Sequence, residues 1–402
     1  MTTGSHTTIL FGAFDRHNFG DMLLPHIVSA MLPDQLFVYA GLMEQDFHHY
    51  GGHIVSAIST LTKELEDRPV NLIHVGGELL TCDAWQAAVM LSPVEWVSEI
   101  IQSLDNREAE KIEWVRNELR TAALAPYTVP RQQFQNTARV IYNSVGGVDL
   151  NALSPAMRDE VLTKLRDADF VSVRDVHTHA ALAAANVHAS LLPDPVVMVA
   201  ELFGEKIWQC TNAVEMDNIL NTFPQGYLAV QFSADFGDDA TLNEIASQLD
   251  RVASATGLGI VFFRAGAAPW HDDLDCYRRI KARLHSPSKA MFESLDLWDI
   301  CALIAHATGY CGSSLHGRIV ATAFALPHVN LIHPQYAKHH SKADAYANTW
   351  EPDASAVCDI HTIAPALTRA LGSDTGKRLG TAQTLAARYR IGFAELAAIL
   401  QR

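Results

Sequence analysis

The chain has 402 residues, of which 49% are hydrophobic and 19% are charged, a mixture typical of folded domains rather than of disordered segments. At about 150 residues per domain, this length predicts two or three domains. Lysine and arginine number 30 and aspartate and glutamate 45, which gives a formal net charge of −15. This balance argues against a nucleic-acid-binding protein, because a basic surface supplies most of that attraction. It does not exclude an anionic substrate, because a local pocket can oppose the overall sign.

The six cysteines lie far apart and form no CxxC pair, so they indicate neither a disulfide framework nor a zinc finger. The segment Met1 to His6 lacks the basic region and apolar core of a signal peptide. No uninterrupted apolar run approaches the roughly 18 residues of a membrane span. We therefore expect a cytoplasmic protein with no membrane span, for which oligomer formation is possible.

The first half of the chain alternates short β-branched or aromatic runs with longer segments of helical period. Apolar residues three and four apart predict helices at 54–66 and 94–124, and a further helix beginning near Asp21. Such alternation is typical of a parallel sheet covered by helices on both faces. The predicted strands are 7–14, 36–40, 70–75, 139–145 and 170–173.

A second series of alternating elements begins after Pro193-Asp194-Pro195. A last helix at 381–401 follows a glycine-rich break at 372–380. The chain therefore belongs to the α/β class, with two doubly wound domains that face a cleft, and ligands of such sheets bind beyond the carboxyl ends of the strands. The predicted strands are 227–232, 259–263, 290–293, 306–311 and 328–332, and the predicted helices are 242–256, 272–284, 298–305 and 317–325.

Two glycine-containing junctions follow predicted strands of the first domain. In the first, Asn18 and Gly20 permit a tight turn, Asp21 is the expected N-cap, and the helix that follows offers N–H groups to an anion. In the second, Gly76 and Gly77 let the backbone approach a ligand. Each junction has a plainer interpretation, a well-capped turn for the first and close packing of helix on strand for the second.

A third junction places Arg174 directly after the predicted strand 170–173. An arginine at the end of a strand can hold a phosphate or a carboxylate with two parallel hydrogen bonds. The alternative is a surface ion pair between Arg174 and Asp175.

The fourth junction reads Gly312-Ser313-Ser314-Leu315-His316 and precedes a helix rich in small residues. Histidine has the side chain best suited to acid–base chemistry near neutral pH. The serines and the helix N-terminus add hydrogen-bond donors for an anion. A structural histidine is the alternative, but the position after a strand, beside glycine and serine, favours a functional one.

Metal binding is not expected. Neighbouring histidines occur at His48-His49, at His177-Thr178-His179 and at His339-His340, but no pair has the helical spacing and the carboxylate of an HExxH site. Neither a GxSxG segment nor a spaced Cys–His signature indicates a hydrolase.

Taken in order, these junctions resemble the polysaccharide pyruvyl transferase family. The resemblance spans roughly residues 8–345, and the set of motifs is more specific than any one of them. The matching segments are Asn18-Phe19-Gly20-Asp21, Gly76-Gly77, Ser172-Val173-Arg174-Asp175, Pro193-Asp194-Pro195, and Ser314-Leu315-His316-Gly317 followed by Ala321 to Ala325 and Pro327.

The resemblance implies two Rossmann-like domains similar to those of GT-B glycosyltransferases. We place them at 1–200 and 201–375, with a C-terminal helix at 376–402. It also implies transfer of a pyruvyl group from phosphoenolpyruvate, the donor substrate, to a glycan or glycan precursor as a cyclic ketal; no further cofactor is certain. His316 and Arg174 are the catalytic candidates. The donor-binding candidates are Asn18, Gly20, Asp21, Gly76, Gly77, Gly312, Ser313, Ser314 and Arg264.

The sequence departs from the family at one position. The family usually carries arginine immediately before Leu-His-Gly, where this chain has Ser314, and a serine makes no charged bidentate contact. Another cation must then hold the donor, or the donor must differ. The candidate cations are Arg318, Arg264, Lys338 and Lys342.

Two other functions remain open on these residues. A nucleotide-sugar glycosyltransferase of the same architecture would use the 312–317 turn for a diphosphate. A non-catalytic member of the family would bind an anionic glycan or a partner protein. Ligand-dependent thermal stability distinguishes the three, because a ligand that binds only the native state raises its stability.

Overall fold

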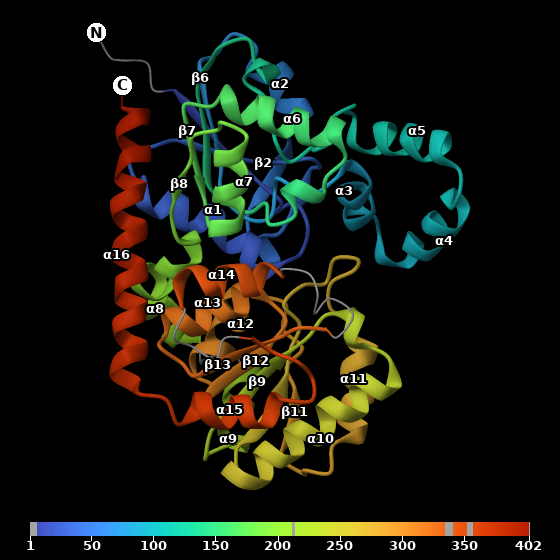
Figure 1. Cartoon of the computed structure of the whole chain (residues 1–402), viewed down its shortest axis with the longest axis vertical. Helices are drawn as coiled ribbons and strands as arrows, with labels where there is room; N and C mark the ends of the chain where they lie inside the picture. Colours follow the sequence, from blue (N-terminus) through green and yellow to red (C-terminus); the bar gives the residue numbers. More distant parts are fainter. Residues whose placement is uncertain (1–5, 211–213, 334–340, 352–356, 402) are drawn as a thin grey trace. The chain divides into compact units, whose positions relative to one another are not determined.

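The computed structural model describes residues 6–210, 214–333, 341–351 and 357–401. The chain forms two compact units, the first made of Met1–Pro195 with Arg388–Arg402 and the second of Val196–Ala387 (Figure 1). The predicted division had boundaries at 200/201 and 375/376. The units differ from it mainly in the last helix, α16 (Thr375–Leu400), whose first half belongs to the second unit and whose second half to the first.

The first unit is built on an eight-stranded sheet of order β3-β4-β2-β1-β5-β6-β7-β8 within the described residues. All of its pairs are parallel except β3–β4. The central strands are buried along nearly their whole length, as expected for a parallel sheet with both faces covered. The strands are β1 (Thr7–Phe11), β2 (Phe37–Gly41), β3 (Gln45–Asp46), β4 (Ile54–Ala57), β5 (Val70–His74), β6 (Thr137–Val145), β7 (Phe170–Val173) and β8 (Ser190–Leu191).

Helices connect these strands, and several of them bury a face in the hydrophobic core beside the sheet. In Figure 1, α4 and α5 form a hairpin in the connection between β5 and β6. The helices are α1 (Phe19–Met31), α2 (Ile58–Glu64), α3 (Ala84–Leu91), α4 (Val94–Leu104), α5 (Glu108–Leu119), α6 (Pro155–Arg166) and α7 (Val176–Ala184), with short 3₁₀ turns at η1 (His48–Tyr50), η2 (Arg131–Gln133) and η3 (Leu150–Ala152).

The predictions of two helices in this unit are wrong in part. The segment predicted as helix 54–66 begins as strand β4, which pairs with β2 and buries Val55 completely, so its β-branched residues follow their strand preference. The segment predicted as one helix over 94–124 is broken between α4 and α5. There Asn106 has a φ of 58°, a left-handed conformation that asparagine tolerates better than most residues.

The second unit is built on a six-stranded sheet of order β11-β10-β9-β12-β13-β14 within the described residues, and all of its pairs are parallel. Each of the five strands predicted after residue 222 corresponds to one of them, so the predicted α/β class with two parallel sheets is confirmed. The strands are β9 (Tyr227–Gln231), β10 (Gly259–Phe262), β11 (Lys289–Met291), β12 (Gly309–Gly312), β13 (His328–Leu331) and β14 (Val357–Cys358).

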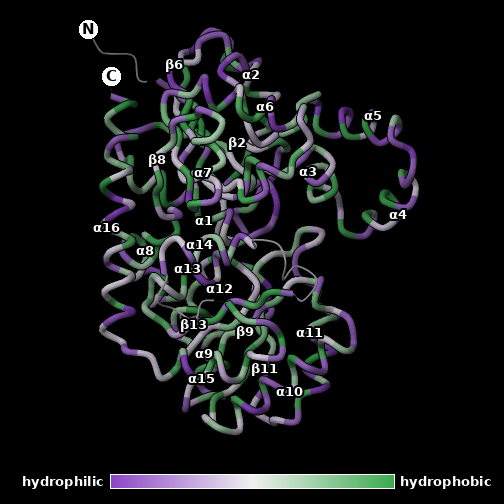
Figure 2. The backbone as a smooth tube through the Cα atoms, in the orientation of Figure 1, coloured by the Kyte–Doolittle hydropathy of each residue, from purple (hydrophilic) through white to green (hydrophobic). Residues whose placement is uncertain are grey.

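The helices of the second unit pack on this sheet around a core of aliphatic and aromatic side chains. In Figure 2, hydrophilic and hydrophobic segments alternate along α10, as expected for a helix with one face in solvent. None of the helices in the described ranges combines the length and the apolar character needed to cross a membrane. The helices are α8 (Val199–Gln209), α9 (Val214–Thr222), α10 (Asp239–Thr256), α11 (Leu274–Arg283), α12 (Leu297–Ala305), α13 (Leu315–Ala323), α14 (Lys342–Trp350) and α15 (Ile363–Leu371), with 3₁₀ turns at η4 (Pro195–Met198) and η6 (Ala234–Phe236).

The last helix begins earlier than predicted. Gly376 and Gly380 lie inside α16 rather than in a break before it. Each costs about 1 kcal/mol relative to alanine in a helix interior. Contacts near the helix start offset this cost, because Asp374 accepts a hydrogen bond from the Lys377 N–H at 2.7 Å and Arg378 donates to the Ala325 carbonyl at 2.8 Å.

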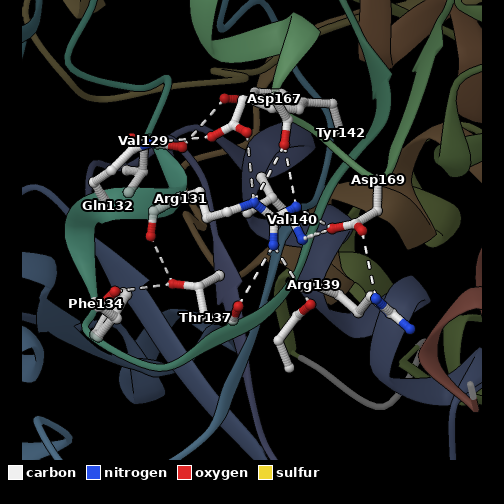
Figure 3. A network of polar contacts seen from close by, with 11 residues as sticks. Val129, Arg131, Gln132, Phe134, Thr137, Arg139, Val140, Tyr142, Asp167 and Asp169 are labelled. Carbon is white, nitrogen blue, oxygen red and sulfur yellow. Dashed lines mark hydrogen bonds and ion pairs between the residues drawn. The ribbon is translucent and has the colours of Figure 1, made fainter.

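An ion-pair network fastens the amino-terminal edge of the first sheet (Figure 3). Arg131, in η2, forms an ion pair with Asp169, whose carboxylate also accepts the Val140 N–H at 2.7 Å. Arg139 lies 3.5 Å from the other oxygen of Asp169. These groups join the 120–136 connection to β6 and β7 at the edge opposite to the strand ends that carry the predicted site.

Candidate functional site

The turn that carries His316 lies at the carboxyl end of β12, as predicted. Ser314 is the N-cap of α13 and its Oγ accepts the Gly317 N–H at 3.2 Å. A Cβ at Gly312 or at Gly317 would collide with the Tyr310 hydroxyl, so both positions require glycine on steric grounds. His316 itself is buried, with 7% of its surface exposed. The sequence Gly-Ser-Ser-Leu-His-Gly therefore specifies a tight, capped turn that holds an imidazole in the protein interior.

A network of side chains from other strand ends supports this turn. Gln231, the last residue of β9, accepts the Ser314 N–H at 2.9 Å through its Oε1 atom. Its Nε2 group donates to Asp272 Oδ1 at 2.7 Å. The Ala265 N–H, just beyond β10, donates to the other oxygen of Asp272 at 2.6 Å. Asp272 was not among the predicted site residues, because it lies in a loop with no recognisable motif.

Asp272 has an unusual titration. Burial raises the pKa of this carboxyl to about 7, although the hydrogen bonds from Ala265 and Gln231 favour the ionised form and lower it. Burial raises the pKa of the nearby Tyr277 and Tyr310 hydroxyls, and the charge of Asp272 raises the pKa of both further. The network beneath the His316 turn therefore contains a group that changes charge near neutral pH.

We expect the Asp272→Asn substitution to change how stability depends on pH. The folded-state pKa exceeds the unfolded value near 3.9, so the native state binds the extra proton between about pH 4 and pH 7. The contribution of Asp272 to stability therefore falls as pH rises through that window, by at most about 4 kcal/mol for a shift of about 3 units.

Urea unfolding at pH 5 and pH 8 measures this effect. The wild type should lose more stability between the two pH values than Asp272→Asn does. Asp217→Asn, at an exposed position on α9, is the control and should behave as the wild type. Equal pH dependence in wild type and Asp272→Asn would contradict the assignment.

Arg318, a candidate replacement for the missing family arginine, is fully buried. Its Nε and Nη2 groups donate to the two carboxylate oxygens of Glu351 at 3.0 and 3.1 Å, and Nη1 donates to Asn330 Oδ1 at 3.2 Å. The amide of Asn330 in turn donates to the carbonyl oxygens of Gly312 and Ser314. Arg318 therefore supports the turn from behind, and its pairing with Glu351 argues against Arg318 among the candidate cations for the donor.

Arg264 is a better-placed cation. It lies two residues after the end of β10, is half-buried, and precedes the Ala265 N–H that binds Asp272, so it lies at the same edge of the sheet as the His316 turn. Lys342 begins α14, and Lys338 lies outside the described residues.

In the first unit, the structure brings the first two junctions together. Asn18, rather than Asp21, is the N-cap of α1, and its Oδ1 accepts the Gly20 N–H at 3.1 Å. The expectation that Asp21 is the cap is therefore wrong; Asp21 lies in the first turn, where a carboxylate also interacts favourably with the helix dipole. Gly76 and Gly77 have φ values of 125° and 89°, and a Cβ at Gly77 would lie 3.1 Å from Asp21 Oδ1.

A buried polar group beside these junctions was not predicted. Tyr127 donates its hydroxyl proton to Asp15 at 2.7 Å and accepts a bond from Arg16 at 3.0 Å. The Leu42 N–H donates to Asp15 at 2.6 Å. Burial raises the pKa of Asp15 against the opposing effect of Arg16. The pairing residue Tyr127 is more than 110 positions away in sequence, so no local pattern could indicate it.

Arg174 lies at the end of β7 but is not exposed. Its guanidinium, 3% exposed, donates to Asp194 and to Glu78, each at 2.9 Å. Asp175 does not pair with it on the surface; instead it caps α7 through the Thr178 N–H at 2.8 Å. The Pro193-Asp194-Pro195 motif thus supplies a fully buried partner for Arg174.

The structure therefore assembles the predicted residues in two groups. Asn18, Gly20, Asp21, Gly76 and Gly77 lie together in the first unit, as the contacts of Gly77 and Asn18 show; Arg174 ends a strand of the same sheet. In the second unit, Gly312 ends β12, Ser313, Ser314 and His316 follow it, and Arg264 follows β10. The predicted convergence of Arg174 with His316 stays a prediction, because the two residues belong to different units.

Among the described residues, no group of three His, Cys, Asp or Glu side chains is placed to hold a metal ion.

Solved structures with the same fold include nucleotide-sugar enzymes. UDP-N-acetylglucosamine 2-epimerase from Rickettsia bellii aligns with a TM-score of 0.57 at 11% identity, over 99% of this chain and 97% of that one. UDP-GlcNAc 2-epimerase from Neisseria meningitidis, bound to UDP-GlcNAc, aligns with a TM-score of 0.53 at 11% identity, over 98% of this chain and 100% of that one. An α,α-trehalose-phosphate synthase (UDP-forming) from Burkholderia xenovorans aligns with a TM-score of 0.52 at 12% identity, over 99% of this chain and 100% of that one. These likenesses confirm the GT-B-like fold.

No curated protein matches the sequence significantly. The sequence model of the polysaccharide pyruvyl transferase family, in contrast, matches residues 140–334. The matched segment contains both Arg174 and the turn with His316. The resemblance to this family that the order of the motifs predicted is therefore confirmed over residues 140–334.

Proposed function

We propose that the protein transfers a pyruvyl group from phosphoenolpyruvate to two hydroxyls of a glycan or glycan precursor. The observation that carries this proposal is the buried turn Ser314-Leu315-His316-Gly317 at a strand end within the segment matched by the family. The turn offers an imidazole for acid–base chemistry at the edge of a parallel sheet where ligands bind.

The chemistry follows from the donor. Protonation of the methylene carbon of phosphoenolpyruvate creates an oxocarbenium-like centre at the adjacent carbon. One sugar hydroxyl bonds to this carbon and loses its proton, the bond to the phosphate oxygen breaks, and the second hydroxyl closes the ketal ring. His316 supplies or relays the proton, a role that typically accelerates such a reaction by about 10²–10⁴-fold.

The cation that holds the donor is Arg264 in this proposal. Arg318 is paired with Glu351, and Arg174 is paired with two carboxylates, so an anion near Arg174 would also meet the negative charges of its partners. We assign Arg174 a positioning role, in which it fixes Glu78 and the loop that contains Gly146. A Cβ at Gly146 would collide with both the Glu78 carboxylate and the Arg174 guanidinium.

Two alternatives are tested by the same experiment. The structural neighbours named above bind UDP-linked sugars or form UDP, which supports a nucleotide-sugar donor as the second candidate. A family member without catalytic activity would bind neither donor.

Thermal unfolding with a panel of ligands distinguishes these functions. Phosphoenolpyruvate at about 100 times its Kd should stabilise the wild type by about 2.7 kcal/mol. Arg264→Gln should weaken donor binding by about tenfold or more, because a charged hydrogen bond contributes about 1.5–3 kcal/mol. Arg278→Gln, at an exposed position on α11, should bind as the wild type.

Each other outcome favours a different function. Stabilisation by UDP or UDP-sugars, without an effect of phosphoenolpyruvate, would replace pyruvyl transfer with glycosyl transfer. No stabilisation by either class would favour a non-catalytic protein. Unchanged donor affinity in Arg264→Gln would remove this residue from the donor site.

A further inference from the structure

A cavity lies in the second unit, at the other end of the helix that carries His316. Its volume is about 410 Å³, within the size range of small-molecule sites. The carboxyl end of α13 and the start of β13 form one side of it, and the ends of α14 and α15 and the first turns of α16 form the other. It therefore opens at the amino-terminal edge of the sheet, whereas the His316 turn lies at the carboxyl-terminal edge.

The charges around this cavity are mainly positive. Three cations, Arg369, Lys377 and Arg378, line it, and a fourth, buried Arg318, lies behind it. Two carboxylates, Glu351 and Asp374, also line the cavity. Even with a neutral His328, these groups sum to a charge of +2, in a chain whose net charge is −15. A cationic cavity in an acidic protein is a local reversal of sign that favours a small anion.

The two carboxylates are already engaged by the protein. Glu351 accepts hydrogen bonds from buried Arg318 and lies 2.9 Å from His328 Nε2. Asp374 accepts the Lys377 N–H at the start of α16. These carboxylates therefore oppose an incoming anion less than an unpaired carboxylate would.

The cations are held differently. Arg378 donates to the carbonyl oxygens of Ala325 and Ser373 and to the Thr375 hydroxyl. All three acceptors are neutral, so these bonds fix the side chain without neutralising its charge. Arg369 and Lys377 are exposed at the rim of the cavity, where they can approach a ligand from solvent.

The opposite wall is apolar and contains Leu326, Pro327 and the largely buried Trp350. Arginine and lysine are the usual partners of phosphate groups, and an apolar wall suits the body of a small organic molecule. We propose that this cavity binds a small phosphate ester, with its phosphate at Arg369 and Lys377 and its body against the apolar wall. The proposal does not depend on the proposed transferase reaction.

Calorimetric titration of the full chain with glucose 6-phosphate tests this site. The wild type should bind, and a double variant with Arg369→Gln and Lys377→Gln should bind at least about tenfold more weakly, because two charged contacts are lost. A matched variant with Arg251→Gln and Arg278→Gln removes two exposed charges from α10 and α11 of the same unit and should bind as the wild type. All four replaced residues are exposed, so folding should be preserved.

Titrations of further variants and ligands distinguish this site from the predicted active site. His316→Ala and Arg264→Gln should leave glucose 6-phosphate affinity unchanged, and glucose without phosphate should bind far more weakly. The proposal is overturned by absent binding in the wild type, by equal affinity in the Arg369/Lys377 double variant, or by loss of binding in Arg264→Gln. Inorganic phosphate binding as tightly as glucose 6-phosphate would exclude a role for the apolar wall and would overturn the assignment to an ester.

Discussion

Replacement of His316 by alanine is expected to lower turnover by at least about 10²-fold, because a positioned general acid or base typically contributes 10²–10⁴-fold. The effect should fall on kcat rather than on donor affinity, since in the proposed mechanism the imidazole transfers a proton and does not hold the phosphate. The turn itself should persist, because its backbone is held by Gln231, by the Ser314 cap and by Asn330. Steady-state kinetics and donor titration on the same preparation measure the two effects separately.

His306→Ala is the matched control for this substitution. His306 is a half-buried histidine at the end of α12 in the same unit, and its ring packs edge-on against Trp208. Its removal should leave turnover within a few-fold of the wild type. Near-wild-type turnover in His316→Ala would remove this residue from the mechanism. An equal loss in both variants would show that the assay reports folding rather than catalysis.

Glu351→Gln is expected to destabilise the second unit by about 3–5 kcal/mol, the usual cost of leaving one partner of a buried ion pair uncompensated. Arg318 is fully buried and directs two of its nitrogen atoms at this carboxylate. Burial raises the pKa of Glu351, but Arg318 and His328 outweigh it and hold that pKa well below the usual value. The contribution of Glu351 to the free energy of unfolding is therefore complete above about pH 4.3, which is the pKa of glutamate in the unfolded chain. It is lost only as pH falls through the lower pKa of the folded state.

Chemical denaturation near neutral pH measures this loss. Glu110→Gln is the control, because Glu110 pairs with Arg107 on the exposed surface of α5, where an ion pair contributes about 1 kcal/mol or less. Replacement of both Arg318 and Glu351 by apolar residues should recover stability relative to Glu351→Gln, because no charge remains buried alone. A loss in Glu351→Gln no larger than in Glu110→Gln would contradict the buried pair.

Hydrophobic period and strand propensity were sufficient to predict most of the architecture. The apolar runs at 70–75 and 227–232 became central strands of the two sheets, because a strand buried on both faces leaves a continuous apolar pattern. The segment 54–66 shows the limit of this signal. Its apolar spacing fits a helix, but pairing with β2 converts its first residues to a strand, and such pairing depends on residues elsewhere in the chain.

The candidate site was predictable only where its residues adjoin in sequence. The turn that carries His316 is a continuous motif, and the structure places it at a strand end as expected. Arg318 could not be distinguished from an available cation, because its partner Glu351 lies 33 positions away. Similarly, Arg174 pairs with Asp194 and Glu78, and Asp272 contacts Gln231 across 41 positions. Side-chain pairing over such distances requires the fold.

Product analysis with phosphoenolpyruvate and a glycan bearing neighbouring free hydroxyls tests pyruvyl transfer most directly. Nuclear magnetic resonance follows the ketal methyl group, formed from the donor methylene carbon, and the released inorganic phosphate. We predict that both products appear in equal amounts with the wild type and at least about 10²-fold more slowly with His316→Ala. Phosphoenolpyruvate left intact by an enzyme that consumes a UDP-sugar with the same glycan would contradict pyruvyl transfer.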